Sequence, residues 1–134
     1  MAEVTSRSTA GRETAMRHSV LVIDDEPMIL DAIRIILGDL GCEVVATSVP
    51  TDGVAAAIAR PFDLILTDIR MPVKNGAEIV EAIRAARPDA RIVVISAFPN
   101  DPLVRRALDA GAIDIVRKPF EISKLLDYLD GRST

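Results

Sequence analysis

Residues 20–41 read VLVIDDEPMILDAIRIILGDLG, a short apolar run that is followed by acids and then by an amphipathic stretch. The first four residues are all apolar, which is typical of a strand buried on both faces of a sheet. Apolar residues then recur at helical spacing from Ile29 to Leu40, and Gly41 marks the end of the predicted helix. The stretch therefore predicts one strand–helix unit.

This unit recurs until five strand–helix pairs are complete. The other strands are expected at residues 43–46, 64–66, 92–95 and 113–116. The other helices are expected at 51–60, at a stretch marked by 79–83 and ended by Pro88, at a stretch marked by 103–108 and ended by Gly111, and at 122–129. Alternating strands and helices predict a parallel sheet with helices on both faces. Glu43 and Asp114 suit edge strands, whereas the first, third and fourth strands are uninterrupted apolar runs. We therefore predict an α/β fold, a doubly wound, flavodoxin-like (βα)5 sheet with strand order 2-1-3-4-5.

The composition is that of one globular domain. The chain has 134 residues, of which 49% are hydrophobic and 27% charged, enough for one core and an ordinary surface. The net charge of -4 argues against a nucleic-acid-binding surface. No apolar run approaches the roughly 20 residues of a membrane span, and the N-terminus lacks the apolar stretch of a secretory signal. We expect a cytoplasmic protein that contacts neither nucleic acid nor membrane directly.

The ends of the chain differ from its middle. Residues 1–17 are polar and lack an apolar period, so we expect a flexible tail before a domain at 18–131 and a short C-terminal end at 132–134. The single cysteine, Cys42, excludes an internal disulfide and is interpreted as a small core residue. The single histidine, His18, is expected to be solvated.

Side chains with a carboxylate, a hydroxyl or an ammonium group follow four of the predicted strands. Asp24 and Asp25 follow the first strand, Asp68 the third, Ser96 the fourth and Lys118 the fifth. Polar loops are common and acids often cap helices, so the first pair alone means little. The carboxyl ends of parallel strands, however, meet at one sheet edge, where such folds bind their ligands. The four positions together therefore predict a functional site.

The chemistry of this set follows from its charges. Three clustered carboxylates repel one another and raise each other's pKa, and a hard divalent cation such as Mg²⁺ would relieve that repulsion. An ionised aspartate can attack phosphorus directly to form an aspartyl phosphate. A metal ion, a lysine and a hydroxyl group can then each neutralise charge on the equatorial phosphoryl oxygens. The residue types therefore favour phosphoryl transfer to a carboxylate.

Four motifs resemble those of the receiver domains of two-component response regulators. They are VLVIDDEP at 20–27, LILTDIRMPVKNG at 64–76, VVISA at 93–97 and IVRKPF at 115–120. The resemblance covers about residues 18–131. It implies a phosphoryl-accepting signalling switch, not an enzyme, that takes phosphate from a histidine kinase or a phosphotransfer protein.

The resemblance also implies roles for single residues. Asp68 would be the phosphoryl acceptor and would help to hold Mg²⁺. Asp25 would ligate the ion directly, Asp24 mainly through a bound water, and Arg70 through its backbone carbonyl. Gly76, with Met71 and Pro72, would serve turn geometry and packing.

Further implied features concern the switch. Ser96 would move to bond the phosphoryl group, Lys118 would pair with Asp68 and then with that group, and the Lys118-Pro119 peptide bond would be cis. Relatives usually carry Tyr or Phe three residues before the lysine, but this chain has Ile115 there. The implied readout surface for a downstream protein, or for a phosphorylation-dependent dimer, comprises residues 103–108, 113–116 and 122–129, including Arg105, Arg106 and Lys124.

Three alternatives share parts of this pattern. A phosphatase of the haloacid dehalogenase type also forms an aspartyl phosphate. Such enzymes carry two acids spaced one residue apart after the first strand, whereas Asp24 and Asp25 of this chain are adjacent. A nucleotide-binding module would need a glycine-rich turn where this chain has Asp-Asp-Glu-Pro. An inactive receiver is disfavoured because all five site residues are present. With no output domain after Thr134, we favour a stand-alone receiver over the receiver part of a longer regulator.

Overall fold

A computed structural model of the chain describes residues 18–119 and 122–129. The predicted tail at 1–17 and the end at 132–134 lie outside these residues. The elements alternate along the chain as β2 (Ser19–Ile23), α2 (Pro27–Asp39), β3 (Glu43–Thr47), α3 (Pro50–Ala59), β4 (Leu64–Asp68), α4 (Gly76–Ala86), β5 (Ile92–Ser96), α5 (Pro102–Asp109), β6 (Asp114–Arg117) and α6 (Ile122–Leu129). The predicted five strand–helix pairs are therefore confirmed.

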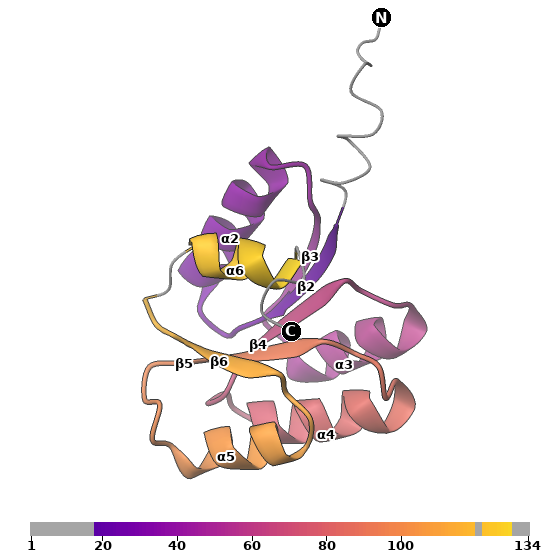
Figure 1. Cartoon of the computed structure of the whole chain (residues 1–134), viewed down its shortest axis with the longest axis vertical. Helices are drawn as coiled ribbons and strands as arrows, with labels where there is room; N and C mark the ends of the chain where they lie inside the picture. Colours follow the sequence, from indigo (N-terminus) through magenta and orange to yellow (C-terminus); the bar gives the residue numbers. More distant parts are fainter. Residues whose placement is uncertain (1–17, 120–121, 130–134) are drawn as a thin grey trace, which may run out of the picture.

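All five strands lie in one parallel sheet in the order β3-β2-β4-β5-β6 (Figure 1). This is the predicted order 2-1-3-4-5, and Glu43 and Asp114 each begin an edge strand. Four of the five predicted strands ended one or two residues early, and at two of them the backbones of Asp68 and Ser96 still pair with neighbouring strands. Both residues are therefore held rigidly by the sheet itself.

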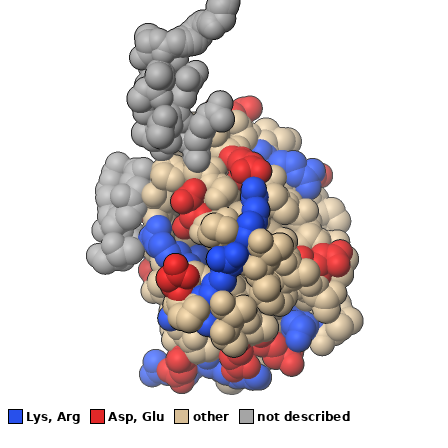
Figure 2. Space-filling view, turned by 90° about the vertical axis from the view of Figure 1, so that its right-hand side faces the viewer, with Lys and Arg blue, Asp and Glu red and all other residues tan. Residues whose placement is uncertain are grey.

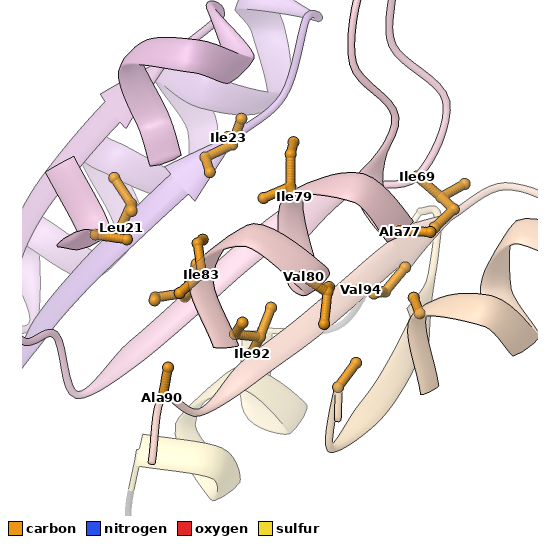
Figure 3. Packing of buried hydrophobic residues seen from close by; sticks show 14 of the residues in the cluster. Leu21, Ile23, Ile69, Ala77, Ile79, Val80, Ile83, Ala90, Ile92 and Val94 are labelled. Atoms are coloured by element: carbon orange, nitrogen blue, oxygen red, sulfur yellow. The ribbon is translucent and has the colours of Figure 1, made fainter. Parts of the chain in front are cut away.

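Each central strand sends alternate side chains to opposite faces of the sheet. On one face, Leu21 and Ile23 pack with residues of α4 such as Ile79 and Ile83 (Figure 3). On the other face, Val20 and Val22 join the cluster that includes buried residues of α2 and α6. Figure 1 shows α2 and α6 on one side of the sheet and α3, α4 and α5 on the other. This three-layer arrangement leaves the carboxyl ends of the strands free to form a site.

Local sequence determines where the helices next to that edge begin. Asn75 and Glu78 form a capping box at α4, with reciprocal bonds between the side chain of each and the backbone N–H of the other, both of 2.9 Å. A Cβ added to Gly76 would lie 2.4 Å from the backbone oxygen of Asp68, so this close approach requires glycine. Helix α3 begins at Pro50, one residue before the predicted start, because proline is well accommodated in a first helical turn. None of the helices within the described ranges is long and apolar enough to cross a membrane.

Candidate functional site

The carboxyl ends of the strands form the walls of one cavity of about 300 Å³. It is lined by Asp25, Glu26, Asp68, Ile69, Arg70, Ser96, Ala97, Phe98 and Lys118. Residues from four strand ends, up to 94 positions apart between Asp24 and Lys118, thus meet as predicted, with Asp24 ion-paired to Lys118 beside the cavity. The parallel sheet brings them together without any local sequence link.

Asp24, Asp25 and Asp68 form an acidic cluster. One carboxylate oxygen from each lies within 4.8 Å of the others. Asp24 is fully buried, Asp68 is nearly so and Asp25 is exposed. Among the described residues, Asp24 Oδ2 has no hydrogen bond of good geometry, although Lys118 Nζ lies 3.0 Å away as an ion-pair partner. Three converging oxygen ligands, one of them buried and short of a donor, fit a hard divalent cation such as Mg²⁺.

Lys118 is the cationic centre of the site. Its Nζ lies 3.0 Å from Asp24 Oδ2, 3.3 Å from Asp68 Oδ2 and 2.5 Å from Glu26 Oε1. The sequence did not predict the short contact with Glu26. Glu26 does precede α2 as its N-cap, but its side chain makes no capping bond and extends to the lysine instead. The Lys118-Pro119 peptide bond is cis, as predicted.

Burial and charge shift the acidities of these groups. Burial, and next the charge of Asp24, raise the pKa of Asp68 to about 6, against the opposing effects of Lys118 and of the Ile69 N–H. Burial also raises the pKa of Asp24, which the backbone N–H of Glu26 and the charge of Lys118 oppose. Burial lowers the pKa of Lys118, but its carboxylate partners outweigh this and hold it above the ordinary value. The mutual carboxylate effect was predicted, but burial is the larger cause.

Ser96 and Arg70 occupy the wall next to α5. The Ser96 hydroxyl accepts a bond from the Phe98 N–H and contacts the Phe98 carbonyl, both at 3.0 Å, so it is engaged within its own loop. The guanidinium group of Arg70 donates two bonds to Asp101, of 2.6 and 2.7 Å. Asp101 is the N-cap of α5, where it accepts a 2.9 Å bond from the Leu103 N–H. Sequence reasoning assigned Arg70 only a backbone role and missed this pair.

Of the predicted readout elements, α5 begins just after this wall and β6 pairs with β5, whereas α6 packs on the opposite face of the sheet (Figure 1). The predicted surface residues Arg105, Arg106 and Lys124 are all exposed. Ile115, at the usual aromatic position, is half-buried and packs against the cluster that α5 covers. On the other side of β6, the buried Tyr128 of α6 donates a hydrogen bond to Asp114. Burial and this bond raise the pKa of Tyr128.

Comparison with known proteins agrees with this geometry. The profile of the response regulator receiver domain matches residues 20–130. The transcriptional regulatory protein KdpE of Mycobacterium tuberculosis is 38% identical over 110 residues, which are 82% of this chain and 48% of that protein. The chain thus spans about half the length of this curated relative.

Solved structures of similar fold extend the comparison. A CheY-like receiver domain protein from Methanospirillum hungatei superposes with a TM-score of 0.81 at 27% identity, covering 87% of this chain and 94% of that one. The receiver domain of a sensor histidine kinase from Pseudomonas aeruginosa superposes with a TM-score of 0.79 at 27% identity, covering 87% and 98%. That structure has a magnesium ion coordinated in its active-site cleft.

Proposed function

The chain belongs to the response regulator receiver domain family, and from this premise we propose that Asp68 accepts a phosphoryl group in a two-component phosphorelay. The observation that carries the proposal is the position of Asp68 at the end of the central strand β4, where it belongs to the acidic cluster and lies 3.3 Å from Lys118 Nζ. The phosphorylated form then presents a changed surface on α5, β6 and α6. We take the domain to span residues 18–131.

The transfer needs no separate base. With a pKa of about 6, Asp68 is largely ionised at neutral pH and serves as the nucleophile itself. One of its oxygens bonds the phosphorus of a phosphohistidine while the P–N bond breaks, and the imidazole leaves with the electron pair. Lys118 already lies 3.3 Å from Asp68 Oδ2, so its charge can balance the incoming phosphoryl oxygens.

The metal requirement follows from the acidic cluster. Asp24, Asp25, Asp68 and the backbone carbonyl of Arg70 would hold Mg²⁺, which when bound would offset carboxylate repulsion and the charge of the transferring group. The chain's own part is to hold Asp24 and Asp68 fixed: Asp24 Oδ1 accepts from the Glu26 N–H at 2.9 Å, and Asp68 Oδ1 accepts from the Ile69 N–H at 2.8 Å. One oxygen of each carboxylate therefore remains directed towards Lys118.

The partners that fit are proteins. A histidine kinase or a phosphotransfer protein would supply the phosphoryl group, and a downstream protein, or a second copy of this domain, would read the changed surface in the cytoplasm. On the face shown in Figure 2, basic side chains lie among acidic ones, in keeping with the net charge of -4. We propose no direct contact of this domain with nucleic acid. Nothing in the described residues or in the matched proteins favours an aspartyl-phosphate phosphatase.

Intact-mass analysis after treatment with acetyl phosphate tests the assignment. The wild-type chain should gain one phosphoryl group when Mg²⁺ is present and almost none when the metal is chelated. Asp68→Asn should gain none, whereas Asp89→Asn, which changes an exposed acid before β5 at the opposite sheet edge, should label normally. Equal labelling of Asp68→Asn and the wild type would show that another residue is the acceptor.

A further inference from the structure

The Arg70–Asp101 ion pair connects the phosphorylation site to helix α5. Arg70 lines the cavity two residues after Asp68, and Asp101 caps the first turn of α5. Their side chains meet through two parallel bonds of 2.6 and 2.7 Å, the fork geometry that arginine makes with a carboxylate. The bond to Arg70 lowers the pKa of Asp101. The pair spans 31 positions in sequence and joins the loop after β4 to the loop after β5.

The two partners differ in how freely they can move. The Arg70 side chain is 63% exposed, whereas that of Asp101 is only 6% exposed because it lies beneath the guanidinium group and against the start of α5. Arginine has a long, flexible stem, so Arg70 can leave Asp101 with little loss of packing. Asp101 would keep its capping bond to the Leu103 N–H. The mobile half of the pair is therefore the half that lines the site.

We propose that the guanidinium group of Arg70 exchanges Asp101 for the phosphoryl group on Asp68. This inference rests on the proposed function. A phosphoryl group offers a higher charge than a carboxylate and three acceptor oxygens, which a guanidinium fork matches well. The exchange frees the N-terminus of α5 from its connection to the loop after β4. It gives the chain a route from the site to α5 that does not depend on an aromatic ring at Ile115.

Substitutions of Arg70 and of Asp101 should change the rate of labelling in opposite directions, which tests the exchange. Acetyl phosphate loses acetate as its P–O bond breaks and Asp68 bonds the phosphorus, so the rate of mass gain reports how readily the site binds the phosphoryl group. Arg70→Ala should slow labelling by about threefold to tenfold, because one charge-assisted contact is lost. Asp101→Asn should accelerate labelling by a similar factor, because Arg70 no longer has to leave a carboxylate. Asparagine caps helices as well as aspartate does, so α5 should remain intact.

The double variant separates exchange from a simple change in local charge. In the Arg70→Ala background, Asp101→Asn should have little further effect on the rate. If Asp101→Asn accelerates labelling equally with and without Arg70, or if both single variants slow it, the exchange is wrong and the pair is a structural link only. Arg70→Lys, which keeps the charge but not the fork, should give an intermediate rate and replaces Arg70→Ala if that variant does not fold.

Two controls complete the design. Glu81 and Arg106 form a second two-bond pair, of 2.7 Å each, between α4 and α5 but outside the cavity. Glu81→Gln should therefore leave the labelling rate at the wild-type value, and a change as large as that of Asp101→Asn would overturn the proposal. Asp68→Asn should abolish labelling in every background. If it does not, the acceptor assignment fails, whereas unchanged rates in the Arg70 and Asp101 variants alone reject only the exchange.

Discussion

Replacing Asp68 by asparagine should stabilise the fold at neutral pH when Mg²⁺ is chelated. Burial and Asp24 raise the pKa of Asp68 from its ordinary 3.8 to about 6, so the folded state resists ionisation of this group. At about 1.4 kcal/mol per pH unit, the difference corresponds to about 3 kcal/mol. Asparagine keeps an oxygen that can accept from the Ile69 N–H. The shift already includes the opposing attraction of Lys118, so we expect a gain of up to about 3 kcal/mol, or up to about 12 °C in Tm.

The pH dependence of the gain has a definite sign. Between the unfolded-state pKa of 3.8 and the folded-state pKa of about 6, folding takes up a proton on Asp68, so this group destabilises the fold increasingly as the pH rises. Above about pH 6 the full destabilisation is present, and below about pH 4 it disappears. The advantage of Asp68→Asn should therefore be large at about pH 7.5 and small at about pH 4.

Urea unfolding at both pH values measures this difference. Tyr128 is the single tyrosine, it is buried, and the chain has no tryptophan, so its fluorescence reports unfolding alongside circular dichroism. Asp89→Asn removes an exposed carboxyl group at the other sheet edge and should show no such gain. Added Mg²⁺ should stabilise the wild type more than Asp68→Asn. A destabilised Asp68→Asn, or an equal gain at both pH values, would refute the reasoning.

Two further predictions concern the metal and the switch. Asp25→Ala should weaken Mg²⁺ binding far more than Glu26→Ala, because Asp25 belongs to the acidic cluster whereas Glu26 faces Lys118; equal losses in a metal titration would contradict this. Beryllofluoride bound at Asp68 should shift the amide NMR signals of residues 97–102 and α5 while the Ile115 rotamer stays the same, because a Cβ-branched side chain has a restricted χ1. A large rotation of Ile115, or shifts confined to α2, would show that the signal takes another route.

The sequence was sufficient for the sheet and for the convergence of the site. Continuous apolar runs identified the central strands, and one acid in each of the remaining two strands placed them at the edges. These patterns are local, and the parallel topology then brings every strand end to the same side. The positions of Asp24, Asp68, Ser96 and Lys118 at one edge of the sheet could therefore be predicted from the sequence.

The carboxylate partners of Lys118 and Arg70 could not be predicted in this way. Lys118 meets Glu26 across 92 positions and Arg70 meets Asp101 across 31, so both contacts depend on the paths of loops that carry no periodic pattern. Sequence motifs indicate which residues line a site, but a long side chain can reach any of several acids nearby. Both pairs became visible only once the loops had a definite geometry.

The positive charges of Lys118 and Arg70 also bear on how one phosphoryl group could change the readout surface. Reversing a two-state equilibrium from about 1:99 to 99:1 needs about 5.5 kcal/mol of differential interaction. A hydrogen bond to a charged group contributes about 1.5–3 kcal/mol. One new contact therefore supplies too little free energy to reverse the equilibrium, whereas two supply nearly enough. Lys118 follows β6 directly and Arg70 is bonded to the N-cap of α5, so we expect each to act on a different element of the readout surface. Because Ile115 cannot supply the usual ring movement, we expect the switch to need both Lys118 and Arg70, and losing either one should leave a graded response in place of a complete one.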